Sequence, residues 1–87
     1  PRVFAAAYDF EQDDAAARLV AVTFYWPTDA NRTLFAERVA YLIQEFSLDE
    51  RATGGVLVAT LAGGVQLTLE DVPVEGAVKE TYALPTK

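Results

Sequence analysis

Apolar residues alternate with small or polar ones near the start of the chain, and this period of two predicts a strand from Val3 to Phe10. The segment from Arg18 to Trp26 is rich in β-branched and aromatic residues and predicts a second strand. The polar residues 11–14 between them predict a connecting turn. Both faces of the second strand are largely apolar, which is typical of a central strand covered on both sides.

After Pro27 the apolar period changes from two to that of a helix, over a segment from Ala30 to about Ser47. Its apolar positions fall within one half of the helix circumference: Leu34, Phe35, Val39, Leu42, Ile43 and Phe46. This pattern predicts an amphipathic helix that packs on a sheet. Thr28 or Asp29 is expected to cap its first turn.

Two further apolar runs, residues 56–62 and 65–71, flank Gly63-Gly64, which is typical of a hairpin with a two-residue turn. That turn would place Thr60 opposite Leu67. The same register predicts one buried face made of Val56, Val58, Val65, Leu67 and Leu69. A last strand is expected over residues 77–84, with Val78, Tyr82 and Leu84 on one face.

The predicted order is therefore β-β-α-β-β-β, in a single α+β domain over residues 1–87. We expect a mostly antiparallel sheet with one amphipathic helix packed on one face. A crossover from the second strand to the third would be right-handed if these strands were parallel neighbours. One helix covers only one sheet face, so the second apolar face of the strand over 18–26 needs another cover. A homodimer or a protein partner would supply it.

Composition removes several kinds of chemistry. The sequence contains no Cys and no His, so disulfides, thiol nucleophiles, imidazole bases and the commonest metal ligands are excluded. We expect no metal and no cofactor. The net charge of −6 argues against binding to nucleic acids or to anionic membranes. No signal peptide or spanning segment is visible, so a cytoplasmic location is expected, and the Arg- and Ala-rich composition favours a bacterial or phage source.

Pro1 is a possible catalytic residue, because an amino-terminal proline offers a secondary amine, as in the small tautomerases. In those proteins the first strand leads directly into a long helix, whereas here a second strand follows. Residues 9–14 are acidic but lack the glycine and glutamate of a calcium loop, so they are better read as a solvated turn. Gly54-Gly55 and Gly63-Gly64 lack the lysine of a phosphate loop and are explained as turns.

Aromatic side chains are the most informative candidates for contacts, because Tyr and Trp supply large rigid area at binding hot spots. Phe24 and Trp26 share a strand face and are expected to lie beneath the helix, whereas Tyr25 points to the other face. The candidate partner-binding residues are the four tyrosines, Tyr8, Tyr25, Tyr41 and Tyr82.

These observations favour a small acidic, non-catalytic interaction module of the inhibitor, immunity or adaptor type, which binds a partner protein or itself through an apolar sheet face. An alternative is a small dimeric ligand-binding protein or isomerase-type enzyme with a sheet–helix or inter-subunit pocket and possible use of the Pro1 amine. A third possibility is a structural subunit that adds neighbours at exposed strand edges, because few Lys or Pro residues protect the first and last strands.

Overall fold

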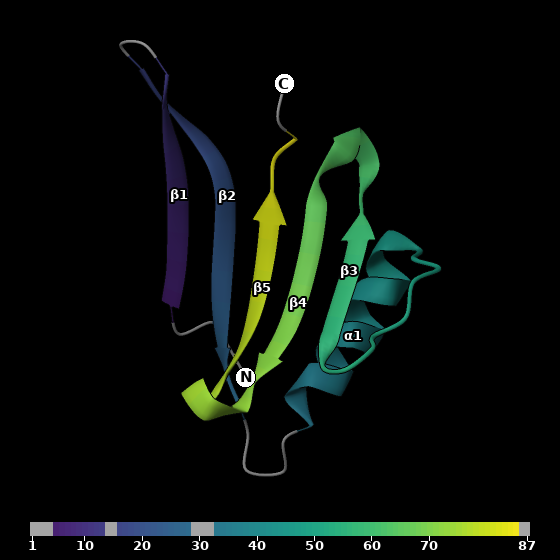
Figure 1. Cartoon of the computed structure of the whole chain (residues 1–87). Coiled ribbons are helices and arrows are strands. Elements are labelled where there is room, and N and C mark those ends of the chain that lie inside the picture. The colour runs from purple at the N-terminus through teal and green to yellow at the C-terminus, as the bar shows by residue number, and fades with distance from the viewer. Residues whose placement is uncertain (1–4, 14–15, 29–32, 86–87) are drawn as a thin grey trace.

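A computed structural model describes residues 5–13, 16–28 and 33–85. The chain forms an α+β domain with one helix and a five-stranded antiparallel sheet, which confirms the predicted class and element order (Figure 1). The elements are β1 (Ala5–Asp13), β2 (Ala16–Pro27), α1 (Leu34–Phe46), β3 (Val56–Thr60), β4 (Gln66–Val72) and β5 (Ala77–Ala83). Within these described ranges, no helix is long and apolar enough to cross a membrane.

The strands lie in the order β1-β2-β5-β4-β3, and every neighbouring pair is antiparallel. The last strand of the sequence is therefore the middle of the sheet, and the edges are β1 and β3. The last strand therefore offers no exposed edge to which a neighbour could add. The strands before and after the helix are not neighbours, so no parallel crossover is formed. Strand β5 is central because it forms antiparallel hydrogen bonds with β2 on one side and with β4 on the other.

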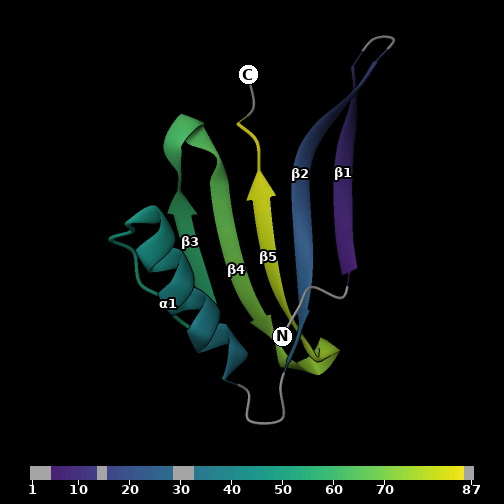
Figure 2. The same ribbon diagram turned by 180° about the vertical axis from the view of Figure 1, so that it is seen from behind.

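Helix α1 covers only part of one sheet face. It lies behind β3 and β4. Strands β2 and β1 lie toward the opposite edge of the same sheet, away from the helix (Figures 1 and 2). The core lies between this helix and β3, β4 and β5. Its buried side chains are Leu34, Leu42, Leu57, Leu67, Leu69 and Val78. Strand β1 contributes no side chain to this core, so the helix-side face of the outer strands is left without a cover from the described elements.

The helix is shorter than the predicted segment 30–47. It spans Leu34–Phe46, and Thr33, rather than Thr28 or Asp29, is its N-cap residue. The backbone N–H of Thr28 donates to the carbonyl of Gly76, which ties the end of β2 to the turn before β5. Asp29 lies outside the described residues. At the other end Ser47 adopts the left-handed conformation and closes the last turn.

The register predicted for the β3–β4 hairpin is wrong by one residue. Thr60 pairs with Gln66 and Leu57 pairs with Leu69, because residues 61–65 form a wider turn in which the Leu61 N–H donates to the Val65 carbonyl at 2.7 Å. A slip of one residue turns a strand over. As a result Leu57 is fully buried, whereas Val58, predicted to be in the core, is 52% exposed. In the observed register Leu57 and Ala59 are the buried residues of β3, in place of the predicted Val56 and Val58.

The β1–β2 hairpin is longer than predicted and extends past the rest of the sheet (Figure 1). Residues 11–13, predicted to be a turn, continue β1, and Glu11 pairs with Arg18 and forms a 2.8 Å ion pair with it. Strand β2 pairs with β5 only from Ala21 onward. Residues 10–13 and 16–19 thus form a two-stranded arm that has no partner strand in β5.

The sheet face opposite the helix carries mainly small and β-branched side chains. On β2 these are Ala21 and Thr23, and the Thr23 hydroxyl lies 3.1 Å from that of Thr81 on β5. Tyr25 also lies on this face, where the Lys79 ammonium is 5.7 Å from its ring centroid. None of the described elements covers this second face of β2 (Figures 1 and 2).

Candidate functional site: a buried ion pair beside an aromatic patch

Glu80 on β5 is a charged residue that lies buried in the described part of the chain, with 3% of its surface exposed. Its Oε1 accepts hydrogen bonds from Trp26 Nε1 at 3.1 Å, and from Arg38 Nε and Nη2 at 3.1 and 2.8 Å. Its Oε2 accepts one from the Tyr82 hydroxyl. These residues come from β2, α1 and β5, so the Glu80 cluster (Trp26, Arg38, Glu80 and Tyr82) connects three elements.

Strand alternation explains why this carboxylate is buried. Glu80 lies between Val78 and Tyr82 on the helix-side face of β5, directly opposite Leu69 of β4. Burying a charge is costly unless it is paired and hydrogen-bonded. Arg38 meets this need from the helix, because its guanidinium stacks 4.2 Å from the Trp26 ring centroid while it binds the carboxylate.

A shallow cavity of about 280 Å³ lies against the helix flank beside this cluster. It is lined by Trp26, Leu34, Glu37, Arg38 and Tyr41. Glu80 is not among the lining residues, and both of its oxygens accept hydrogen bonds from neighbouring side chains. The carboxylate therefore holds the helix against the sheet and does not present a base to this cavity.

The Tyr82 hydroxyl is held in its neutral form. Burial raises the pKa of Tyr82 well above its usual value near 10, and the hydrogen bond to Glu80 raises it further. A folded-state pKa above the unfolded one means that the folded chain holds this proton more tightly. Tyr82 thus stabilises the fold below pH about 10, and that contribution is lost as the pH rises toward its folded-state pKa.

We expect the free energy of unfolding to fall above pH about 10, and to fall less steeply in Tyr82→Phe. Urea unfolding at a series of alkaline pH values measures this slope. Tyr8→Phe is the matched control, because the Tyr8 side chain is exposed and should leave the slope unchanged. Equal slopes in the wild type and Tyr82→Phe would contradict the assignment.

Large aromatic side chains lie on the helix-side face that α1 leaves open. Tyr8 and Phe10 on β1 are 59% and 62% exposed. Tyr8 lies opposite Val22, which lies opposite Tyr82, and the Phe24 ring packs edge-on against Tyr82 at 6.1 Å between centroids. On the helix flank the exposed Tyr41 ring stacks on Arg38 at 4.7 Å. We call this surface the aromatic patch: Tyr8, Phe10, Phe24, Tyr41 and Tyr82.

The structure brings three of the four candidate tyrosines to one side of the sheet. Tyr8, Tyr41 and Tyr82 belong to the aromatic patch, whereas Tyr25 lies on the opposite face beside Lys79. Trp26 packs against the core margin near the helix, as expected, whereas Phe24 packs against Tyr82 and is not among the residues of that core. Pro1 lies outside the described residues.

Phe10 and Glu80 were not predicted as candidates. Phe10 follows Tyr8 at an interval of two, so strand alternation alone places both on one face. Glu80 occupies an apolar face between Val78 and Tyr82, and a charge in such a position signals a buried ion pair. Its partner cannot be identified from the sequence, because Arg38 comes from a distant helix.

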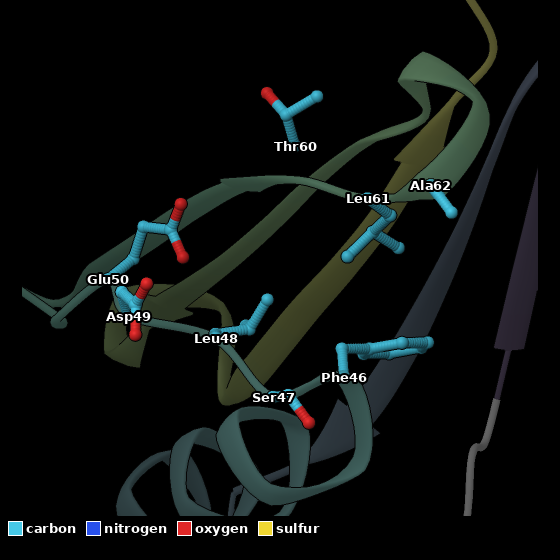
Figure 3. Close-up of a pocket in the computed structure, with 8 residues that line it drawn as sticks. All are labelled: Phe46, Ser47, Leu48, Asp49, Glu50, Thr60, Leu61 and Ala62. Carbon is cyan, nitrogen blue, oxygen red and sulfur yellow. The ribbon is translucent and has the colours of Figure 1, made fainter.

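A second cavity of about 310 Å³ lies between the end of α1 and the β3–β4 turn (Figure 3). Its lining residues are Phe46, Ser47, Leu48, Asp49, Glu50, Thr60, Leu61 and Ala62. Asp49 and Glu50 lie together at one end of it (Figure 3). The described part of the chain contains no group of three or more potential acidic metal ligands, so this carboxylate pair is not a metal centre built from those residues.

No protein-family model, curated protein or solved structure matches the chain.

Proposed function

We propose that this protein is a small acidic, non-catalytic interaction module of the inhibitor, immunity or adaptor type. It binds a partner protein, or a second copy of itself, through the aromatic patch on the helix-side face of β1, β2 and β5. The observation that carries the proposal is the helix placement: α1 covers β3 and β4 and leaves aromatic side chains exposed beside it.

The composition of the patch supports this reading. Aromatic residues are enriched at binding hot spots because they bury a large rigid area at little entropic cost. Full burial of a side chain the size of Phe10 contributes about 1.5–3 kcal/mol relative to exposure. The underlying Phe24–Tyr82 contact and the Glu80 cluster fix the floor of the patch before a partner arrives. Such a preformed surface lowers the ordering cost of association.

Charge and composition add two finer elements to the proposal. The net charge of −6 keeps separate molecules apart and favours a partner with basic groups. We place the protein in the cytoplasm of a bacterial or phage-infected cell, on the strength of its Arg- and Ala-rich composition.

One observation favours the alternative of a ligand-binding protein: the cavity beside Trp26, Arg38 and Tyr41 joins a cation to two aromatic rings. A planar anionic ligand would fit that chemistry. Arg38 already binds Glu80, however, so a ligand there would have to share the guanidinium. The interaction module therefore remains the better supported function.

Phe10→Asp is expected to abolish the assembly that the protein forms, because it places a charge within the aromatic patch, at its most exposed ring. The measurement is native mass spectrometry of the untagged protein purified from its own host. Val74→Asp is the matched control, since Val74 is an equally apolar residue, 92% exposed, in the turn before β5.

The control variant should keep the wild-type assembly, and circular dichroism should show that both variants are folded. A wild-type protein that is monomeric at all concentrations would contradict the proposal. So would an assembly that Phe10→Asp leaves intact.

A further inference from the structure

Strand β1 is an open edge of the sheet. It has nine residues, pairs with β2 on one side only, and no described element lies beyond it (Figures 1 and 2). The opposite edge, β3, has five residues and runs beside α1 and the segment that leads from the helix (Figure 2). The two edges are therefore unequal, and β1 is the longer and less covered of them.

Strand β1 lacks most of the features that protect an edge strand, and the only ones that it carries among the side chains described are the charges of Asp9 and Glu11. Natural edges are blocked by Lys, Pro or a bulge, and β1 contains neither Lys nor Pro. The register shift opposite Asp9 and Phe10 skips Val20, so the extra residue lies in β2 and β1 stays regular. Every second residue of β1 thus directs its backbone N–H and C=O away from β2, where another strand can pair with them.

The two faces of β1 carry different chemistry. Tyr8 and Phe10 lie on the helix-side face and belong to the aromatic patch, whereas Asp9 and Glu11 lie on the opposite face. Asp9 and Glu11 are both exposed, and Glu11 already forms the 2.8 Å ion pair with Arg18 of β2, so a basic residue of a partner would share its carboxylate with Arg18. A strand added beside β1 would place its own alternate side chains next to these two sets. Apolar residues would match the first set, and basic residues the second.

We infer that the partner of this interaction module contributes an extended segment that alternates apolar and basic residues, and that this segment adds to the β1 edge as a sixth strand. The inference rests on the proposed function and specifies its partner. Main-chain hydrogen bonds supply the pairing, and the alternating side chains select the sequence. Phe10 and Tyr8 then bury their exposed rings against the apolar positions of the incoming segment.

A second copy of the chain is a poorer occupant of this edge. In a two-fold dimer with one continuous sheet, the Asp9 and Glu11 carboxylates of both copies would lie on the same face, between molecules that each carry a net charge of −6. Like charges on neighbouring strands are destabilising. A basic segment places opposite charges in the same positions.

The test uses a nine-residue peptide of alternating lysine and valine, and measures amide hydrogen exchange of the full chain by NMR. With excess peptide, the outward-facing β1 amides should exchange at least about tenfold more slowly, as expected for newly paired backbone groups. A peptide of alternating glutamate and valine should give no protection. Binding should weaken as salt is raised from 50 to 500 mM, because exposed charges are screened.

Asp9→Lys should weaken peptide binding by about three- to tenfold, and Asp9→Asn should weaken it less. Asp49→Lys is the matched control, an exposed carboxylate in the segment after α1, and should change little. Unchanged β1 amides at millimolar lysine–valine peptide would overturn the inference. Equal protection by the glutamate–valine peptide would also overturn it, as would β1 amides protected by self-association without any peptide.

These outcomes are separable from the test of the proposed function. If Phe10→Asp abolishes the native assembly while the peptide leaves the β1 amides unchanged, only the sixth-strand inference fails. If Phe10→Asp leaves the assembly intact, the proposed function itself fails.

Discussion

Glu80→Ala is expected to lower the free energy of unfolding by about 3–5 kcal/mol, the usual cost of removing one partner from a buried ion pair. The variant leaves the Arg38 side chain, which is 16% exposed, without its carboxylate partner. It also removes the acceptor for Trp26 Nε1 and for the Tyr82 hydroxyl. A small domain has only about 5–15 kcal/mol of stability, so this loss is a large part of the total. Urea unfolding followed by tryptophan fluorescence measures it.

Glu75→Ala is the control for Glu80→Ala, because it breaks an ion pair of the same kind on the surface. The Glu75 carboxylate lies 3.3 Å from the Lys79 ammonium and is half exposed, so its loss should cost at most about 1 kcal/mol. The double variant Glu80→Leu with Arg38→Met should recover much of the stability, since it replaces both charges by apolar groups. A Glu80→Ala cost as small as that of Glu75→Ala would show that the cluster does not hold α1 in place.

The Glu80 cluster links stability to the proposed binding surface. Tyr82 belongs both to the cluster and to the aromatic patch. The Arg38 guanidinium stacks on the Tyr41 ring at the helix flank. The carboxylate therefore fixes one border of the patch as well as the position of the helix. A buried polar network of this kind is retained where a unique arrangement matters, even if apolar residues would be equally stable.

The element order follows from the sequence because each element has a strong local pattern. The predicted strand forms β1 over its described residues 5–10, and the predicted amphipathic segment forms α1. The strand order does not follow from such patterns, because periodicity says which face of a strand is apolar but not which strand lies next to it. In the structure β5 pairs between β2 and β4, which separates β1 and β2 from β3. The helix lies against β3 and β4, so it leaves β1 uncovered (Figure 2).

The candidate site was predictable to a similar degree. Tyr8 and Tyr82 have the chemistry of contact residues in any fold, but their common surface depends on the β1-β2-β5 order. Tyr25 follows the same chemical reasoning and lies on the opposite face, because neighbouring residues of a strand point to opposite sides. The ion pair between Arg38 and Glu80 joins residues 42 positions apart, a distance at which sequence spacing carries no geometric information.

The β3–β4 turn shows how one local assumption can reverse a whole face. Gly63-Gly64 suits a two-residue turn, and both glycines do adopt positive φ angles. The turn nevertheless spans residues 61–65, and β3 shifts by one residue against β4. The hydrophobic pattern of β3 could not correct the error, since Val56 and Val58 are as apolar as the alternating set that contains Leu57.

Leu57→Ala is expected to destabilise the protein by about 2–5 kcal/mol, the range for truncating a fully buried leucine. Leu57 packs in the core with Leu69, its partner across the strands, and with Leu42 from the helix cluster. Val58→Ala is the matched control on the next residue of the same strand. Its side chain is half exposed on the opposite face, so its loss should cost well under about 1 kcal/mol.

The ratio of these two costs distinguishes the two registers. In the structure Leu57 is in the core and Val58 is outside it, whereas a two-residue turn at Gly63-Gly64 would exchange their places. Equilibrium urea unfolding of both variants gives the ratio directly, and an unchanged m-value would show that the unfolded state is the same in each. A larger cost for Val58→Ala than for Leu57→Ala would contradict the observed pairing, and with it the core against which α1 packs.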